Sequence, residues 1–502
     1  MRLAKATTNP QGIAVDDGER QRTWAELAER STRVARLLRD EFGLRPDDHA
    51  ALFMQNRVEF VEIVLGAIEA GIWLTPINWH LQAEEVAYIL EDSGARVVFA
   101  DPAHAGVAQQ CRATVVVAGD ELDRRLAAAS AEPLPLDGPA GGTMVYTSGT
   151  TGRPKGVKRA RAASLGAALD NIRNYGSALG LDGDGAHLVT GPLYHAAPGL
   201  FAVYDLLNGA PLLVMPRWDA AQALRLIATH RVRHTHMVPT MFVRLLALDA
   251  ALRSRADLSS LRLVLHGAAP VAPEVKRRMI EWWGPILVEY WGASECGVCT
   301  LTDSAAWLSH PGTVGRALPQ WEVFAVDDSG KRLPPEDVGL LYCRHRQLAR
   351  VFEYHGDAEK TARAYLEPGV FTLGDIGRVD ADGWVYLKDR LSHLIISGGA
   401  NIYPVEVEQV LQRHPAVYDV CVFGIPDDEW GESVKAAIEL AEGWQPSSAL
   451  ETEILDFART HLAGYKLPRS IDFELRLPRH PTGKLHVREL RDRYWRGRER
   501  AI

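Results

Sequence analysis

The sequence lacks an uninterrupted apolar run of the length that a membrane span requires. Its most hydrophobic window, residues 58–77, contains Glu59, Glu62 and Glu69, and carboxylates are costly in hydrocarbon. The first residues also lack the apolar core of a secretory signal. We therefore expect a cytoplasmic protein without a transmembrane segment.

Cysteine is scarce, with five residues in a chain of 502. So few thiols fit a reducing compartment better than a disulfide scaffold. Cys296 and Cys299 form one Cys-x-x-Cys pair. No second pair stands at zinc spacing, so two structural thiols are favoured over a metal or redox site.

An excess of positive charge is also missing, since the formal net charge is −8. This argues against nucleic acid as the main partner and favours small molecules. There is no internal repeat or low-complexity segment, and 47% hydrophobic and 24% charged residues are usual for a globular chain. The length of 502 residues suggests about three folding units.

The elements present alternate between two patterns. Thr23 to Glu26 forms a capping box, and an amphipathic helix follows. Further along, apolar β-branched runs alternate with helical periodicity, which predicts largely parallel sheets covered by helices, the α/β class. The expected strands are 96–100, 113–118, 211–215 and 261–265, and the expected helices are 219–229 and 273–283.

Residues 314–389 differ, because short strands punctuated by glycine and proline predict a β-rich subdomain. After Arg390 a compact α+β module is expected, with helices at 405–413 and 451–462 and strands at 417–423 and 471–475. We predict an N-terminal domain of residues 1–390, with the β-rich subdomain at about 314–389, and a C-terminal domain of residues 391–502.

The most informative stretch is residues 146–157, Tyr-Thr-Ser-Gly-Thr-Thr-Gly-Arg-Pro-Lys-Gly-Val. A short apolar strand at 144–146 enters it, after a Pro- and Gly-rich linker at 132–142. Glycines let backbone N–H groups approach an anion, the hydroxyls add donors, and Lys155 adds a positive charge. A flexible surface connection is the alternative. Walker spacing is absent, so the predicted phosphate loop belongs to another class.

This stretch resembles the signature loop of the adenylate-forming (ANL) superfamily, which contains acyl-CoA synthetases, AMP-dependent acid:CoA ligases and adenylation domains. Segments at 289–295, 371–377 and 478–484 follow in the order of that superfamily. The resemblance extends over about residues 23–484. It implies a large N-terminal domain, a small mobile C-terminal domain, and ATP or AMP, Mg²⁺ and coenzyme A as cofactors.

The resemblance assigns nucleotide-binding roles to a set of small, hydroxyl-bearing and basic residues: Thr147, Ser148, Gly149, Thr150, Thr151, Gly152, Lys155, Gly267, Ala268, Trp291, Gly292, Ala293 and Ser294. It assigns Glu295, with Thr151, to Mg²⁺. Tyrosine is usual at the position of Trp291 and threonine at that of Ser294, and an indole still offers a face to adenine. A strand end with a buried aromatic is the alternative interpretation.

The resemblance also implies that Asp375 accepts hydrogen bonds from the ribose hydroxyls and that Arg390 contacts ribose or phosphate. Lys484 would be the catalytic lysine that bridges the carboxylate and the α-phosphate. Taken alone, Asp375 is equally a turn residue between glycines, and Lys484 a solvated turn residue.

Residues 192–195 resemble the segment that lines the acyl pocket, with His195 beside the reacting carboxylate; a core histidine is the alternative. Small side chains at 196, 197 and 199 and at 267–269 suggest a roomy apolar pocket for a bulky or long acid. No charged residue there would pair with an α-amino group, which argues against amino-acid activation.

Coenzyme A must reach the acyl group in a second step, and relatives rotate the C-terminal module between steps. Gly398 and Gly399 would leave room for the pantetheine arm. Ser392 and His393 depart from the usual hinge residues.

We therefore predict an AMP-forming acid:CoA ligase, with the carboxylic acid, ATP and CoA as partners. The alternatives are delivery to a carrier protein, or a relative restricted to one half-reaction or to ligand binding. The acid and the oligomeric state, including a homodimer, stay open.

Overall fold

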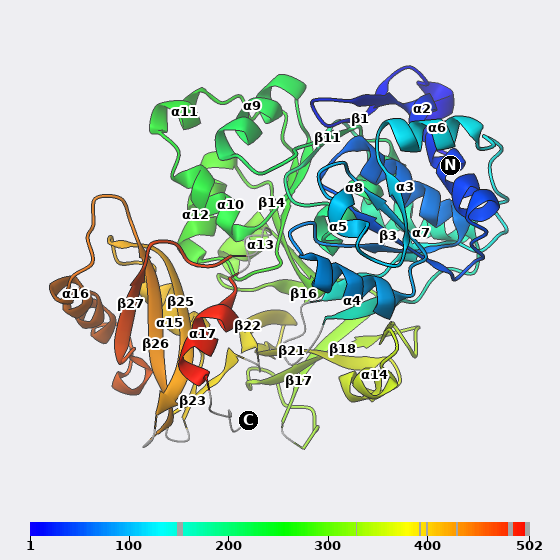
Figure 1. Cartoon of the computed structure of the whole chain (residues 1–502). Coiled ribbons are helices and arrows are strands. Elements are labelled where there is room, and N and C mark those ends of the chain that lie inside the picture. Colours follow the sequence, from blue (N-terminus) through cyan, green and yellow to red (C-terminus); the bar gives the residue numbers. More distant parts are fainter. Residues whose placement is uncertain are drawn as a thin grey trace.

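The computed structural model describes residues 1–147, 154–327, 329–390, 393–397, 400–427, 430–479 and 485–496, except the side chains of Arg390, Ala400 and Asn401. Within these residues the chain forms four β-sheets. Helices surround the sheets of the N-terminal part, and a separate sheet with its own helices follows at the C-terminal end (Figure 1).

The first sheet is parallel and has the order β6-β5-β3-β4-β7. Nearly all residues of its three central strands are buried, as expected when helices cover both faces of a parallel sheet. Its strands are β3 (His49–Phe53), β4 (Trp73–Pro76), β5 (Val97–Ala100), β6 (Thr114–Val117) and β7 (Gly142–Thr143). Its helices are α3 (Val58–Ala70), α4 (Ala83–Ser93), α5 (Ala105–Ala108) and α6 (Asp120–Ala128).

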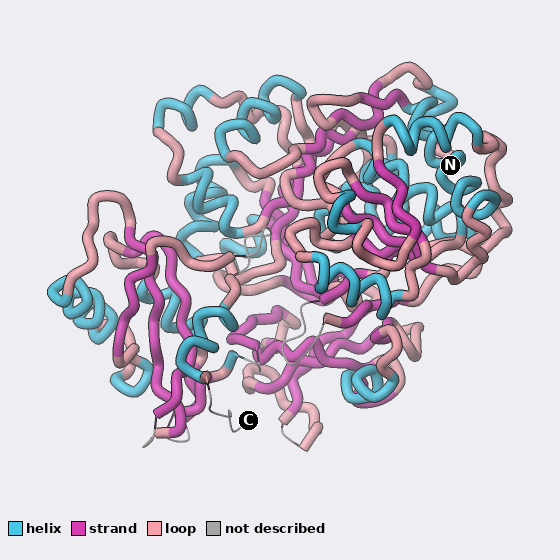
Figure 2. Tube along the Cα trace, viewed as in Figure 1, coloured by secondary structure: helices cyan, strands magenta, loops and turns pink. Residues whose placement is uncertain are grey.

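The largest sheet has fourteen described strands and joins two regions of the sequence. The strands of all the sheets are magenta in Figure 2. Its parallel part is β10 (His187–Val189), β11 (Leu212–Val214), β12 (His234–Met237), β13 (Leu263–His266) and β14 (Leu287–Ala293), with β1 (Ile13–Asp16) and β2 (Gln21–Thr23) at one edge. Its antiparallel part is β15 (Gly297–Asp303), β16 (Gly315–Ala317), β17 (Trp321–Val326), β18 (Gly339–His345), β20 (Tyr365–Glu367), β21 (Val370–Val379) and β22 (Trp384–Arg390).

The β-rich stretch expected at 314–389 therefore does not have a sheet of its own. β16 pairs with β15 on one side and β22 on the other, which continues the large sheet into this region. The helices of the large sheet and the remaining N-terminal helices are α1 (Ala4–Thr8), α2 (Trp24–Arg36), α7 (Leu165–Ala178), α8 (Ala196–Asn208), α9 (Ala220–His230), α10 (Pro239–Leu246), α11 (Ala250–Arg255), α12 (Pro273–Trp283), α13 (Ser304–Ser309) and α14 (Ala358–Ala364).

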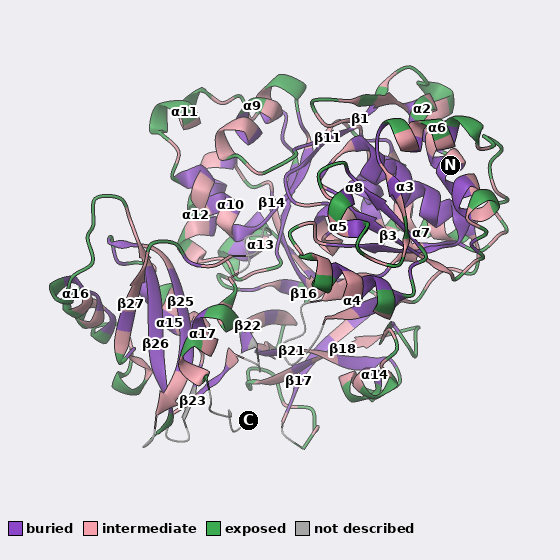
Figure 3. Cartoon of the chain, in the orientation of Figure 1, coloured by how far each residue is buried: buried purple, intermediate pink, exposed green. Residues whose placement is uncertain are grey.

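The apolar window at 58–77 is a buried helix followed by a strand. Every residue of α3 is buried (Figure 3). It packs against α2, which begins with the predicted capping box of Thr23 and Glu26. Among the described residues, no helix is long and apolar enough to cross a membrane.

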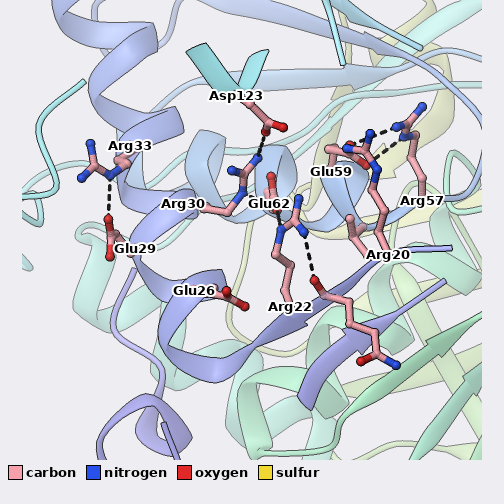
Figure 4. Close-up of polar contacts among 12 residues, drawn as sticks. Arg20, Arg22, Glu26, Glu29, Arg30, Arg33, Arg57, Glu59, Glu62 and Asp123 are labelled. Atoms are coloured by element: carbon pink, nitrogen blue, oxygen red, sulfur yellow. Dashed lines mark hydrogen bonds and ion pairs between the residues drawn. The ribbon is translucent and has the colours of Figure 1, made fainter. Parts of the chain in front are cut away.

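The buried residues Glu59 and Glu62 of α3 form ion pairs with arginines from neighbouring segments (Figure 4). Glu59 lies 2.6 Å from Nη1 of Arg20 and 2.8 Å from Nε of Arg57. Burial alone would raise the pKa of Glu59, but the hydrogen bond and charge of Arg57 hold it below its usual value. One oxygen of Glu62 accepts from Nε of both Arg22 and Arg30, each at 2.7 Å.

The C-terminal module is a mixed sheet with its own apolar core. Its strands are β23 (Ile395–Ser397), β24 (Ala400–Ile402), β25 (Val417–Asp427), β26 (Gly431–Leu440) and β27 (Ser470–Glu474), and its helices are α15 (Pro404–Leu411), α16 (Ser448–Arg459) and α17 (Val487–Trp495). The core gathers side chains from β25, β26, α15 and α16. A core of this kind marks an independently packed unit.

Caps and pairing explain where observed elements differ from expected ones. α12 has the same bounds as the expected helix at 273–283. The helix expected at 451–462 begins earlier, since Ser447 caps it by accepting from the N–H of Leu450. The strand expected at 417–423 continues to Asp427 because β26 pairs with it along its whole length.

Candidate functional site

Two short strands flank the predicted phosphate loop. β8 (Val145–Thr147) enters it, β9 (Lys155–Arg159) leaves it, and β19 (Phe352–Tyr354) pairs with β9. The entering strand begins one residue later than expected. Met144, just before it, is fully buried, whereas the three residues of β8 are half-buried and not buried as expected. Thr147 and Lys155 stand at the ends of the loop, whereas Ser148, Gly149, Thr150, Thr151 and Gly152 lie outside the described residues.

Lys155 is held at the loop by a carboxylate from α4. Its Nζ lies 3.1 Å from Oδ1 of Asp92, and the hydroxyl of Tyr146 donates to Oδ2 of the same residue at 2.7 Å. The hydrogen bond to Asp92 raises the pKa of Lys155, so the amine stays protonated. A cation is thus present at the exit of the loop, with a partner that a phosphate would have to replace.

Glu295 lies in the turn between β14 and β15. Its Oε1 accepts from the hydroxyl of Tyr354 at 3.0 Å, and burial, with Glu295 beside it, raises the pKa of that tyrosine. Since Tyr354 belongs to the strand next to β9, this bond connects the predicted Mg²⁺ ligand to the exit strand of the phosphate loop. Ala293 and Ser294 precede Glu295 and are half-buried.

Gly292 allows the hairpin to close. A Cβ at this position would lie 1.9 Å from the carbonyl oxygen of Gly297, so no other residue fits without moving the backbone.

Trp291 reaches across to the predicted ribose ligand. Its indole Nε1 donates to Oδ2 of Asp375 at 2.8 Å. Trp291 also packs in an apolar cluster with Val157 and Cys296 and is 6% exposed. The indole thus fixes the carboxylate, a role that the resemblance did not imply. Its predicted contact with adenine stays a prediction.

Asp375 lies on β21 directly opposite Arg390 on β22. Two of the residues assigned to ribose or phosphate are therefore cross-strand neighbours. Asp375 is 5% exposed, and one of its oxygens already accepts from Trp291. The carboxylate predicted to bind ribose is therefore fixed in place by the indole.

The loop after β13 contributes Gly267 and Ala268. A Cβ on Gly267 would lie 2.6 Å from the carbonyl oxygen of Tyr290, so the loop packs against β14 just before Trp291. Ala268 has φ of 66°, an uncommon value for a residue with a side chain. The structure therefore places these two residues beside the hairpin that carries Glu295.

His195 is the residue before α8 and is half-buried against the ring of Tyr194, with ring centroids 4.2 Å apart. Close packing already explains why position 199 is glycine, without a need for acyl-group space. A Cβ there would lie 2.6 Å from the carbonyl oxygen of Leu193. The same applies to Gly267, whose size is set by its contact with Tyr290.

The Cys-x-x-Cys pair begins at the residue that follows Glu295 in the sequence. The Sγ atoms of Cys296 and Cys299 are 3.3 Å apart, and both thiols are free and buried. Burial raises the pKa of Cys299, which disfavours the thiolate that a metal or an oxidant needs. In the described part of the chain, no group of three or more histidine, cysteine or acidic residues has metal-binding geometry.

A magnesium site with few protein ligands is compatible with this finding. Mg²⁺ usually takes one or two carboxylates together with substrate phosphates and water. The half-buried carboxylate of Glu295, held by Tyr354, suits that mode.

Other assigned residues, Lys484, Gly398 and Gly399, lie outside the described residues, as does the side chain of Arg390. Conversely, the structure adds Asp92 and Tyr354 to the site. Neither stands in a recognisable motif, so the sequence offered no signal for them.

Lys155 bounds the predicted phosphate loop, Glu295 is bonded to the strand beside its exit strand, and Trp291 on β14 is bonded to Asp375. This arrangement fits the one expected of an adenylate-forming enzyme. The chain belongs to the AMP-binding enzyme family, which matches residues 3–352. The AMP-binding enzyme C-terminal domain matches residues 406–484.

Curated relatives span nearly the whole chain. A feruloyl-CoA synthase from Amycolatopsis sp is 36% identical over 501 residues, covering 98% of each chain. A fatty acid–[acyl-carrier-protein] ligase from Streptomyces coeruleorubidus is 32% identical, covering 96% of this chain and 93% of the relative. The solved o-succinylbenzoate CoA synthetase from Bacillus subtilis, in complex with its acyl-adenylate intermediate, superimposes with a TM-score of 0.81 at 28% identity, covering 97% and 96%.

Proposed function

We propose that the chain is an AMP-forming acid:CoA ligase whose substrate is a bulky or long apolar carboxylic acid. The carbon–sulfur ligase class, with ATP, Mg²⁺ and coenzyme A as cofactors, is that of the family. The observation that carries the proposal is the bond between Glu295 and Tyr354, because it joins the hairpin to the exit strand of the phosphate loop.

The reaction joins two anions, since a carboxylate must approach the α-phosphate of ATP. Mg²⁺, when bound, would offset negative charge on the phosphates. Glu295 would hold it, with Tyr354 orienting one oxygen of the carboxylate. Fixed groups of this kind stabilise developing charge without reorganisation during the reaction.

The nucleotide would be positioned by residues on both sides of the hairpin. Trp291 holds the carboxylate of Asp375 in place, and this carboxylate would accept hydrogen bonds from the ribose hydroxyls. Lys155 would exchange Asp92 for a phosphate oxygen. His195 would lie beside the reacting carboxylate at the beginning of α8.

The second half-reaction is proposed to use a different posture of the C-terminal domain, residues 391–502, on the N-terminal domain, residues 1–390. Lys484 would serve the first step, and Gly398 and Gly399 would border the pantetheine arm in the second. The separate apolar core of the module supports movement as a unit.

The test is an incubation of the purified protein with ATP, Mg²⁺, CoA and a panel of short, long and aromatic acids. Pyrophosphate, acyl-adenylate and thioester are measured separately. We expect all three products with the larger acids. Best activity with acetate or malonate would contradict the proposed pocket, and an absence of pyrophosphate with every acid would contradict the ligase.

A second acceptor is supported by the relative that acts on an acyl carrier protein. In this reading the adenylate forms in the same way, and a carrier thiol replaces that of CoA. The panel distinguishes the two when holo carrier protein and CoA are offered in parallel. Transfer to the carrier at a higher kcat/KM than to CoA would favour the second reading.

Two finer properties are also proposed. We propose a cytoplasmic location, supported by five free cysteines. A homodimer is proposed on the frequency of two-fold oligomers alone, and the mass in solution by light scattering tests it.

A further inference from the structure

Arg159, the last residue of β9, is a cation that the nucleotide site does not use. Side chains alternate along a strand, so Arg159 shares a face with Lys155 and Val157. Val157 packs with Trp291 and Cys296. Arg159 therefore points toward the β14–β15 hairpin, whereas Lys158 points the other way and lies over the ring of Trp73.

The guanidinium lies against the turn that follows Glu295. A Cβ on Gly297 would be 2.9 Å from Nη1 of Arg159 and 3.3 Å from the hydroxyl oxygen of Tyr175. Gly297 has φ of 75°, a backbone conformation that favours glycine. The guanidinium of Arg159 therefore lies beside a residue that is two positions after the predicted Mg²⁺ ligand.

The surroundings of this charge are aromatic. Tyr204 from α8 is the neighbour with the largest favourable effect on its charge, and its ring packs against that of Tyr175. The hydroxyl of Tyr175 is engaged by the backbone of Val298, donating to its oxygen at 3.2 Å and accepting from its N–H at 3.0 Å. Phe201, Tyr204 and Tyr290 belong to one apolar cluster here.

Arg159 has no carboxylate within ion-pair distance among the described residues. A guanidinium carries five N–H donors, and Tyr204 alone cannot satisfy them. A charged group in apolar surroundings is costly without partners. The residue as a whole is half-buried, but its guanidinium lies in the interior, where an oxygen acceptor from a ligand would offset the cost of the charge.

The position of Tyr204 relates this cation to the reacting end of the substrate. Ala197, Phe201 and Tyr204 lie on one face of α8, which begins just after His195. Tyr204 lies seven positions after Ala197, which is about 10 Å along a helix. If an acid held at His195 lay along this face of α8 and displaced part of its apolar packing, its far end would reach the neighbourhood of Arg159.

We infer that Arg159, together with Tyr204, recognises an oxygen acceptor at the far end of the acid substrate. The inference rests on the proposed function and deepens it. The substrate class is an extended acid with a distal hydroxyl, phenolate or second carboxylate, about 8–10 Å from the reacting group by the helix geometry above. The body of the acid remains apolar, and its end is polar.

The experiment compares pairs of acids that differ only at the far end. 4-Hydroxycinnamate is measured against cinnamate, and a long dicarboxylate against the monocarboxylate of equal length. A site built to bind a polar group discriminates strongly against the analogue that lacks it. We expect a kcat/KM ratio of at least about tenfold in favour of one oxygenated acid, and the preferred pair identifies which oxygen is bound.

Arg159→Met is expected to reduce that ratio to about one. Tyr204→Phe, which removes only a hydroxyl, should reduce it in part. Lys158→Met is the matched control, because it removes one positive charge from the same strand on the opposite face, and it should keep the wild-type ratio.

A wild-type ratio near one, or a ratio unchanged in Arg159→Met, overturns the inference while the ligase function stands. Equal loss toward both acids in Arg159→Met and in Tyr204→Phe also overturns it. If no acid yields pyrophosphate with the wild-type protein, the proposed function itself fails.

Discussion

At the residue scale, the site is organised by hydrogen bonds between side chains that are distant in sequence. The bond from Trp291 to Asp375 spans 84 positions, the bond from Tyr354 to Glu295 spans 59, and that from Lys155 to Asp92 spans 63. Each fixes one predicted ligand by a partner on another element. The predicted ligands are thus preoriented before any nucleotide binds.

Trp291→Phe tests this preorientation. The substitution removes the N–H that Asp375 accepts, and a hydrogen bond to a charged group contributes about 1.5–3 kcal/mol. We expect the KM for ATP to rise about tenfold or more, since 1.4 kcal/mol corresponds to a factor of ten. Initial rates of pyrophosphate release at varied ATP provide the measurement.

Trp321→Phe is the control for that variant. Trp321 is equally buried, but its Nε1 has no hydrogen-bond partner among the described residues. The same loss of ring volume therefore removes no bond to a ligand. A similar rise of KM in both variants would show that packing, and not the bond to Asp375, is responsible.

Motifs predicted the candidate ligands but not their hydrogen-bond partners. Glu295 and Asp375 stand in short segments with a recognisable order of residues. Asp92 and Tyr354 lie in an ordinary helix and an ordinary strand, and only the fold brings them near. Trp291 was expected to contact adenine because of its position in a motif; its N–H bond depends on β21, which the motif does not contain.

At the element scale, α3 is a buried apolar helix that contains charged glutamates. Its glutamates face arginines from β2, α2 and the residues just before β2 and α3 (Figure 4). The side chain of Glu62 has no exposed surface, yet it accepts from two guanidinium groups. Loss of one member of a buried ion pair leaves uncompensated charge.

Glu62→Gln is expected to destabilise the N-terminal domain by about 3 kcal/mol, the usual order for breaking a buried pair. The thermal melting temperature, followed by circular dichroism, should fall by several degrees. Glu29→Gln is the matched control, since Glu29 pairs with Arg33 on the exposed side of α2, and such a pair contributes about 0.3–0.5 kcal/mol. Equal shifts in the two variants would contradict the importance of burial.

Elements were predictable where the pattern is local. The alternation of apolar strands and helices gave the α/β class, and the capping box gave the beginning of α2. The pairing of β16 with β15 and β22 was not predictable, because an antiparallel partner on a distant strand leaves no mark on periodicity.

At the scale of the whole molecule, the candidate site residues are distributed between the large sheet and the C-terminal module. The large sheet carries Glu295 and Asp375 on neighbouring regions. The C-terminal module carries Lys484, in a segment outside the described residues. Two steps with different geometric demands are compatible with one fixed and one movable part.

Lys484→Ala separates the two steps. We expect adenylate formation from ATP and acid to fall by at least about 100-fold, as for the loss of one charge-stabilising group. Thioester formation from a supplied acyl-adenylate and CoA should be retained. Lys331→Ala, at an exposed lysine, is the control, and equal loss of both steps in Lys484→Ala would contradict alternation of the module.

The bond between Trp291 and Asp375 also makes the fluorescence of Trp291 a candidate probe of nucleotide binding. An indole whose N–H contacts a buried carboxylate emits according to that carboxylate's surroundings. If ribose hydroxyls bind Asp375 as predicted, we expect the emission of Trp291 to change, and subtraction of the Trp291→Phe spectrum would isolate it from the other tryptophans among the 13 in the chain. Nucleotide occupancy would then be readable without label or turnover.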